Sequence, residues 1–294
     1  MNKKITITLI VVLSVLSLAL IGFMIAVISG GFNGFGLGNF GLNSRTSTKL
    51  VSDKTYDSFD DIEIKANTAD IYIYSSDNSR AQVKIYDDEN RTVVNALHNK
   101  LNIVNNSNGF MSFIRTRAKI EVYLSKTYSE KINISDDLGN IYVEEFPNAD
   151  VEIDEDCGNV EVSECKTADI NNDLGNISVA KAKDIKADES SGNVSIGTVE
   201  NAYVHNDLGN IEVDTVNAYM DISNDCGNIE IRNANITKNS TIKNDLGKIT
   251  VGSTGKVFID ARCDIGKVDV RNNYNQSDIT LKIENSMGDI TVNN

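Results

Sequence analysis

Seven aspartates recur two residues before a recurring glycine, and this even spacing is the first pattern in the chain that could support chemistry. An outward-facing column of carboxylates about 5 Å apart could bind Ca²⁺. The alternative is that each side-chain oxygen accepts backbone N–H bonds within its own turn. We favour the turn role and predict no metal site, because serine replaces aspartate twice and the G-G-x-G-x-D calcium pattern is missing. The column consists of Asp137, Asp156, Asp173, Ser190, Asp207, Asp225, Asp245, Asp264 and Ser286.

Stacked aspartates also occur in β-helical enzymes that cleave sugars. Such hydrolysis needs two carboxyl groups in different environments, one of them with a raised pKa. Repetition makes the acids of this column equivalent, so no catalytic pair is singled out. The chain has two histidines, and His205 falls in an exposed turn column with Ser135, Asn171 and Lys243. No nucleophile-elbow, zincin, phosphate-loop or dinucleotide motif occurs. We therefore predict no enzyme, with no catalytic and no cofactor-binding residues.

The four cysteines, Cys157, Cys165, Cys226 and Cys263, show no zinc-binding spacing. Cys157 and Cys226 share a column with Leu138, Leu174, Leu208 and Leu246, which predicts that they are small core residues. They belong to repeats four apart, or about 19 Å in a stack of strands, which no disulfide spans. Cys165 and Cys263 are further apart still. We expect free, mostly buried thiols.

The element that positions these residues is a repeat of 17 to 22 residues, with sequences such as SDDLGNIYV, NNDLGNISV and HNDLGNIEV. Its central glycine, taken as position 0, occurs nine times. Positions +2 and +4 are β-branched in every repeat, whereas position +3 is mostly polar. This alternation indicates a strand with one buried and one wet face. The central glycines are Gly139, Gly158, Gly175, Gly192, Gly209, Gly227, Gly247, Gly266 and Gly288.

A single repeat cannot bury its apolar side, so the repeats must stack and share one core. The sequence therefore predicts an all-β, single-chain β-solenoid, similar to a parallel β-helix, with about nine to ten rungs. Stacking in chain order would align the asparagines at position +1 into a hydrogen-bonded ladder. Lys248, Lys267 and Asp289 replace asparagine in the last three repeats. The ladder residues are Asn140, Asn159, Asn176, Asn193, Asn210 and Asn228.

The part that precedes the repeats also has alternating strands. We assign residues 55–131 to an N-terminal β cap and residues 132–294 to the solenoid repeats. Within the cap, Asn67–Ile73 has the form of an early, degenerate repeat.

The N-terminus predicts a membrane anchor. Lys3 and Lys4 precede an uncharged run over residues 5–29, long enough to cross about 30 Å of hydrocarbon as a helix. A cleaved signal peptide is the alternative, but its apolar region is usually shorter and ends at a small-residue site. The positive-inside rule places residues 1–4 in the cytoplasm and the body outside. Residues 30–54 are assigned to a Gly/Phe-rich linker.

The charge of the body restricts its partners. Lys3 and Lys4 are two of the 28 basic residues, and the remaining 26 face 42 acidic ones, which leaves a charge of −16. Such a body repels nucleic acid and anionic polymers. The expected partners are the cell membrane, through residues 5–29, and an envelope protein or glycan.

The repeat [ND]-D-L-G-N-[IV]-x-V, together with the preceding AKIEVYLSKTYSEKINISDDLGNI, resembles the bacterial putative-adhesin family over residues 55–292. Members are β-strand-repeat domains without an agreed activity, often behind one transmembrane segment. The resemblance implies a membrane-anchored, adhesin-like scaffold or binding module of the cell envelope. An accessory protein of envelope-stress signalling is the second hypothesis, and a carbohydrate-active β-helix enzyme is the third.

Overall fold

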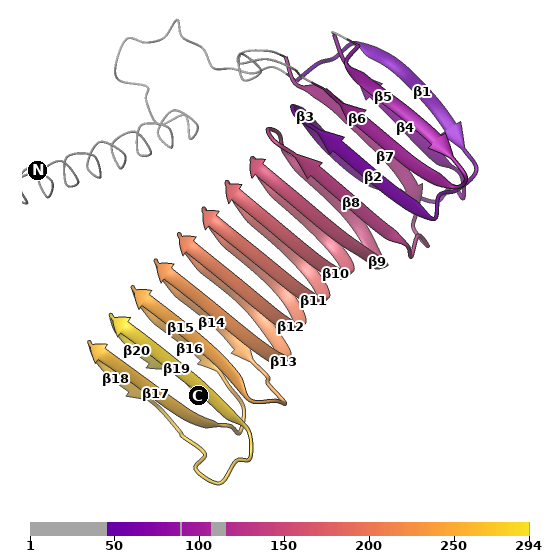
Figure 1. Cartoon of the computed structure of the whole chain (residues 1–294). Coiled ribbons are helices and arrows are strands. Elements are labelled where there is room, and N and C mark those ends of the chain that lie inside the picture. The colour runs from indigo at the N-terminus through magenta and orange to yellow at the C-terminus, as the bar shows by residue number, and fades with distance from the viewer. Residues whose placement is uncertain (1–45, 89, 107–115, 294) are drawn as a thin grey trace, which may run out of the picture. The chain divides into compact units, whose positions relative to one another are not determined.

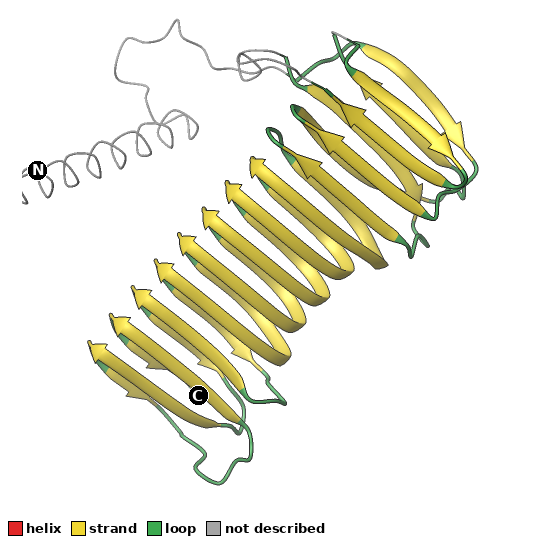
Figure 2. Cartoon of the chain, in the orientation of Figure 1, coloured by secondary structure: helices red, strands yellow, loops and turns green. Residues whose placement is uncertain are grey.

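The computed structural model describes residues 46–88, 90–106 and 116–293 (Figure 1). These residues form one all-β solenoid that contains no helix (Figure 2). The predicted anchor at residues 5–29 and most of the predicted linker lie outside the described residues. Among the residues that are described, none belongs to a helix long and apolar enough to cross a membrane.

Twenty strands make up the described part. The cap and the first rung contain β1 (Leu50–Tyr56), β2 (Asp61–Ala66), β3 (Ala69–Ser76), β4 (Ala81–Tyr86), β5 (Thr92–Leu97), β6 (Lys100–Asn105), β7 (Ala118–Ser125) and β8 (Lys131–Asp136). The long strands of the regular rungs are β9 (Ile141–Cys157), β10 (Val160–Leu174), β11 (Ile177–Ser191), β12 (Val194–Leu208) and β13 (Ile211–Cys226). The C-terminal rungs contain β14 (Ile229–Ala234), β15 (Ser240–Leu246), β16 (Ile249–Ser253), β17 (Phe258–Ile265), β18 (Val268–Val270), β19 (Thr280–Met287) and β20 (Ile290–Val292).

Each rung runs from one glycine corner to the next, and neighbouring rungs pair in parallel and in register, as in Val160↔Ile177 and Ile170↔Ala187. The β-branched residues at positions +2, +4 and −5 point inward and are almost wholly buried in every rung except the Gly266 rung, where Val268 is 44% exposed, so the predicted facing is confirmed for the other rungs. The core is one continuous apolar cluster from Phe59 to Val292.

β2 and β3 form a rung next to β8 and β9. Ile71 pairs with Ile141 and Ile73 with Val143, so Asn67–Ile73 is an early repeat as predicted. On the other side of this rung β6 and β7 pair parallel with β2 and β3, and beyond them the parallel order ends. β1 and β4, β4 and β7, and β5 and β6 all pair antiparallel. β1 begins at Leu50 because it pairs with β4, so an ordered strand occupies residues assigned to the linker.

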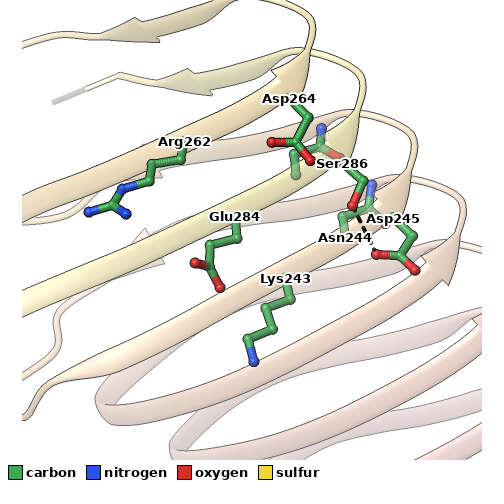
Figure 3. A pocket seen from close by; sticks show the side chains of 8 residues that line it. Lys243, Asn244, Asp245, Arg262, Asp264, Glu284 and Ser286 are labelled. Carbon is green, nitrogen blue, oxygen red and sulfur yellow. Dashed lines mark hydrogen bonds between the residues drawn. The ribbon is translucent and has the colours of Figure 1, made fainter.

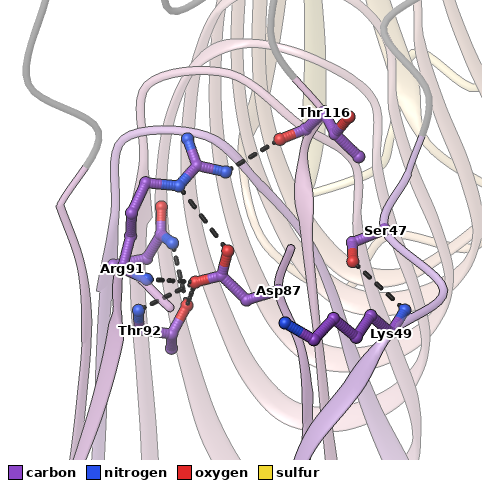
Figure 4. Close-up of polar contacts among 7 residues, drawn as sticks. Ser47, Lys49, Asp87, Arg91, Thr92 and Thr116 are labelled. Atoms are coloured by element: carbon purple, nitrogen blue, oxygen red, sulfur yellow. Dashed lines mark hydrogen bonds and ion pairs between the residues drawn. The ribbon is translucent and has the colours of Figure 1, made fainter. Parts of the chain in front are cut away.

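A buried ion pair fixes the chain within this cap (Figure 4). Asp87 and Arg91 lie 3.6 Å apart with almost no exposed side chain. Asp87 Oδ2 also accepts hydrogen bonds from the Thr92 backbone N and Oγ1, both at 2.9 Å. Arg91 Nη2 donates to the Thr116 carbonyl at 2.8 Å, which joins the β4–β5 turn to the start of β7.

The last two repeats do not stack in chain order. β19 pairs with β15 on one side and with β17 on the other, and β20 lies in the same way between β16 and β18. The Gly288 rung is therefore inserted between the Gly247 and Gly266 rungs, and β17 and β18 form the outer end (Figure 1). The expectation of sequential stacking is wrong for these rungs.

The charges at the outer positions are compatible with the inserted order. In space, Glu284 lies in register between Lys243 and Arg262, and Asp289 precedes Ile290 in the column between Lys248 and Lys267. Stacking in chain order would place Lys243 beside Arg262 and Lys248 beside Lys267. Like charges directly opposite across strands are destabilising. The residues that interrupt the asparagine ladder thus favour the order observed.

Candidate interaction surfaces

A cluster of tyrosines covers the outer face at the N-terminal end of the solenoid. In β3 the buried Ile71 and Ile73 alternate with Tyr72 and Tyr74, which therefore point outward. Register brings in the ring of Tyr142 beside Tyr72 and that of Tyr123 beside Tyr74. Ring centroids are 5.1 Å apart for Tyr74–Tyr123, 6.1 Å for Tyr74–Tyr142 and 6.5 Å for Tyr72–Tyr142. We call this surface the tyrosine face; it also includes Tyr86 of β4.

Charged groups hold the rings in place. The Glu121 carboxylate accepts hydrogen bonds from the hydroxyls of Tyr123 and Tyr86, at 3.1 and 3.3 Å. Lys119 lies 2.8 Å from the same carboxylate and 4.0 Å from the centre of the Tyr86 ring. Burial, followed by the charge of Glu121, raises the pKa of Tyr123 well above its usual range. The Tyr123 hydroxyl therefore stays protonated, and the tyrosine hydroxyls serve as polar tips on an apolar surface.

The tyrosine face ends after one regular rung. The positions in register with Tyr142 in the following rungs are Glu161, Ser178 and Ser195. The aromatic surface is thus a local feature rather than part of the repeat. Sequence analysis did not identify it, although the alternation in DIYIYS contains the signal.

The ladder of asparagines at position +1 is confirmed. Asn159, Asn176, Asn193 and Asn210 each donate both the backbone N–H and the side-chain amide to the Oδ1 of the previous asparagine, at 2.9–3.3 Å. The ladder begins at Asp70, which accepts from Asn140, and its last donor is the Lys248 backbone N.

The prediction that the aspartates at position −2 accept hydrogen bonds within their own turns is wrong. They point outward, and two accept bonds from neighbouring rungs: Asp137 from Asn67 and Asp245 from Ser286. The turn role belongs instead to position −3, one residue earlier, which faces inward. In the described ranges, no three His, Cys, Asp or Glu side chains are grouped so that they could hold a metal ion.

Position −3 forms a buried polar column that sequence analysis missed. Its asparagines donate their side-chain amides to the carbonyl of the glycine one rung away, as in Asn206 Nδ2 to Gly192 O at 3.2 Å. Glu155 and Glu189 accept the backbone N–H of residues 157 and 191 at 3.2 and 3.0 Å. The available signal was the polar residue at position −3, which lies two residues after the inward column at position −5 and so shares its facing. The column contains Asp136, Glu155, Asn172, Glu189, Asn206, Asn224, Asn244, Asn285 and Cys263.

The acids of this column are electrostatically unusual. Burial is the largest cause of a raised pKa at both Asp136 and Glu155, which lie on neighbouring rungs, and the charge of Asp136 raises the pKa of Glu155 further. Burial also raises the pKa of Glu189 to about 7. These groups are enclosed in the stack, so they affect folding rather than contact a substrate.

Position −1 was assigned to the core and instead lies on the surface. Cys226 is exposed and Cys157 is half-buried, and the leucines of their column are likewise either exposed or half-buried. The reason is that strand alternation stops at the glycine corner, where positions −2, −1 and +1 all face solvent. All four cysteines are free, as predicted, but only Cys165 is buried; burial raises its pKa to about 12.

A depression of about 310 Å³ lies over the inserted rung (Figure 3). Its walls carry the alternating charges Lys243, Glu284 and Arg262. The hydrogen bond from Lys282, followed by the charges of Lys282, Lys243 and Arg262, lowers the pKa of Glu284. Because these charges compensate one another, the depression stabilises the stack rather than presenting a free binding group. His205 lies elsewhere, 2.9 Å from Ser223 Oγ and 3.0 Å from Asp207 Oδ1.

Comparison with known proteins agrees with this architecture. The family described as Toastrack DUF4097 matches residues 59–294. The chain belongs to the Toastrack DUF4097 family. The resemblance to putative adhesins inferred from the repeats is thereby confirmed. No curated protein shows significant sequence similarity to this Toastrack chain.

Solved structures similar to the Toastrack chain include a putative adhesin from Bacteroides fragilis, with 16% identity and a TM-score of 0.40 over 84% of this chain and 99% of that one. A putative lipid binding protein from Parabacteroides distasonis has 16% identity and a TM-score of 0.44 over 83% and 98%. A putative adhesin from Parabacteroides merdae has 12% identity and a TM-score of 0.35 over 85% and 97%.

Proposed function

We propose that this Toastrack chain is a membrane-anchored, extracytoplasmic scaffold of the cell envelope that binds its ligand through the tyrosine face. The observation that carries the proposal is the group of five half-buried tyrosines on the outer surface of a rigid sheet. Tyrosine provides a large contact area and a polar tip at little entropic cost, which makes it frequent at binding hot spots. Fixed rings also need little ordering when a partner binds.

The chemistry of this surface favours an envelope protein or a neutral glycan. Lys84, Lys119 and Glu121 surround the rings, so hydrogen-bond donors and acceptors of both charge signs border an apolar centre. The acidic body disfavours nucleic acid and anionic polymers. Catalysis is not part of the proposal, because the outward aspartates repeat from rung to rung and the acids whose pKa values are raised most strongly, Asp136, Glu155 and Glu189, are enclosed.

Anchoring rests on the sequence of residues 1–29. Two lysines before an uncharged run of helix-spanning length favour an uncleaved segment with the body outside. An accessory role in envelope-stress signalling would use the same face, with a membrane protein as its ligand. The nature of the captured partner separates the two roles.

Site-specific photo-cross-linking in intact cells stripped of wall tests the proposal. A photoreactive phenylalanine analogue replaces Tyr142 in one variant and Ser195 in the control, which lies in the same column three rungs away. We expect a discrete product, protein or glycan, only from position 142. Equal capture at both positions, or none at position 142, would overturn the assignment to the tyrosine face.

A further inference from the structure

Exposed apolar side chains form a line along the glycine corner at the C-terminal half of the solenoid. In spatial order position −1 holds Leu208, Cys226, Leu246, Met287 and Ile265, each in register with the next. Leu208, Leu246, Met287 and Ile265 are 49%, 46%, 47% and 63% exposed, and Cys226 is exposed as well. At ~4.8 Å per rung the line is about 19 Å long. We call it the corner ridge.

The two flanks of the corner ridge differ in charge. Position −2 on one flank is mostly aspartate, whereas position +1 on the other flank is asparagine or lysine, with one exception. No rung has like charges on both flanks. The flanking pairs of the five rungs are Asp207/Asn210, Asp225/Asn228, Asp245/Lys248, Ser286/Asp289 and Asp264/Lys267.

The rung that carries Asp289 at position +1 also has no like charges on its two flanks. The rung whose +1 residue is Asp289 is also the rung whose −2 residue is Ser286. Lys248 and Lys267 are exposed, and neither forms a side-chain ion pair with any residue that the structure describes. Among the described residues their side chains are therefore not held in an ion pair, although Asp289 lies in the column between them.

We propose that the corner ridge binds the corner ridge of a second copy of this chain, with the two solenoids parallel. A two-fold axis that runs along the ridge exchanges the flanks, so each rung meets the same rung of the other copy. Asp245 then faces Lys248 of the second copy, Asp264 faces Lys267, and the uncharged Ser286 places no like charge opposite Asp289. An antiparallel arrangement would oppose one aspartate column to the other and is disfavoured.

The apolar line lies on the axis in this arrangement. Each of its residues meets its own counterpart, which covers the exposed leucines and brings the two Cys226 thiols together. A single line of side chains buries less surface than the roughly 800 Å² per partner of a standard interface, so we expect weak, rapidly exchanging pairing. Both N-terminal caps lie at the same end of such a pair, which is compatible with two chains in one membrane.

Cross-linking of the full-length chain in detergent tests the pairing. A short bismaleimide is applied to the Cys157→Ser variant, a substitution that the column already contains at Ser191. We expect a covalent dimer through Cys226. The control combines Cys226→Ser with Glu230→Cys, which moves the exposed thiol to the outer face of the same rung. A dimer from the control as abundant as that from Cys226 would refute the proposal.

A charge-exchange experiment shows whether the contact is between chains. Lys248→Glu and Asp245→Lys, each in the Cys157→Ser background, put like charges on both flanks of one rung. Each alone is expected to reduce the Cys226 cross-link about tenfold. In a mixture of the two, differently tagged, opposite charges face each other, and the mixed dimer should recover. Failure of the mixture to recover, while both variants melt like the parent, would overturn the proposal. Neither result depends on the tyrosine face.

Discussion

Glu155 lies in register with Asp136 on the neighbouring strand, and both carboxyl groups are buried. Removing them from water is the main cause of their raised pKa values, and the charge of Asp136 raises the pKa of Glu155 further. Two buried carboxylates on adjacent rungs cannot both ionise without cost. The asparagines found at the same position in other rungs avoid this penalty.

The first prediction is that the solenoid becomes less stable as the pH rises from 5 to 8. A group whose pKa is higher in the folded than in the unfolded chain binds more protons when folded, so its stabilisation is complete at low pH. It is lost as the pH passes from the unfolded value, near 4, toward the raised folded value. We expect a loss of more than about 1 kcal/mol, measured by urea denaturation at each pH.

Conservative variants isolate the source of this dependence. Asp136→Asn combined with Glu155→Gln should flatten the stability–pH curve and raise stability at pH 8. Glu161→Gln removes an exposed acid from the neighbouring rung and serves as the control for general charge. If the control flattened the curve as much, repulsion among surface acids rather than the buried pair would be the cause.

The second prediction concerns the glycine corner. A Cβ atom at Gly209 would lie 1.6 Å from the carbonyl oxygen of Gly192 on the adjacent rung, and the φ of +144° is also unfavourable for other residues. Gly209→Ala should therefore cost more than about 2 kcal/mol. Chemical denaturation measures it, with Glu212→Ala on the wet face as the control, expected to stay within about 0.5 kcal/mol. Equal losses in both variants would contradict the tight approach of the rungs.

The solenoid itself was predictable because the same alternation of apolar and polar positions occurs in nine repeats. Columns such as Ile211 at +2 and Val213 at +4 gave the strands, and the asparagines gave the ladder. At the corner the same reasoning failed, because alternation stops there and Leu208, although apolar, points outward. The cap was only partly predictable, since its antiparallel strands occur once and offer no repeat to compare.

The inserted rung was not predictable from apolar columns. The repeats around Gly247, Gly266 and Gly288 all carry β-branched residues at positions +2 and +4, so these two columns do not order the rungs. The charges at the outer positions show a preferred order only when the neighbouring rungs are known. Likewise, Tyr74 and Tyr123 are far apart in the chain, and only the register between β3 and β7 shows that they share one surface.

The third prediction tests the charge order of the C-terminal rungs. Glu284 lies in register between Lys243 and Arg262, so Glu284→Lys places three cations in consecutive rungs. Because these groups are partly exposed, we expect a loss of about 1–2 kcal/mol that shrinks in high salt. Urea denaturation at two salt concentrations measures it. Glu212→Lys, on a regular rung, should show little change; a comparable loss there would argue against a special role for the charge order.

The fourth prediction is that calcium does not stabilise the chain. The outward aspartates lie in separate rungs and are not grouped as ligands in the described part of the chain. The melting temperature should therefore be the same in EDTA and in millimolar Ca²⁺. One ion at a hundred times its Kd would add about 2.7 kcal/mol, which is easily detected. Magnesium at matched ionic strength controls for screening, and a rise with calcium alone would restore the aspartates as ligands.

The fifth prediction concerns topology. Protease added to intact cells stripped of wall should digest the body and spare a fragment of about 30 residues that contains Lys3 and Lys4. Detection of an N-terminal tag on that fragment provides the measurement. A protected body, or a mature N-terminus near Gly30, would contradict the uncleaved anchor.

The inserted rung also determines when the molecule can be finished. Rungs that follow one another can form as the chain emerges, but β19 and β20 must enter between strands made earlier. Until residues 280–292 arrive, β15 and β17 each present an unpaired edge, the kind of edge that promotes aggregation and proteolysis. A chain cut before residue 280 would keep both of these edges open. Residues 280–292 thus close the gap between β15 and β17, while the far edge of β17 has no partner among the described strands.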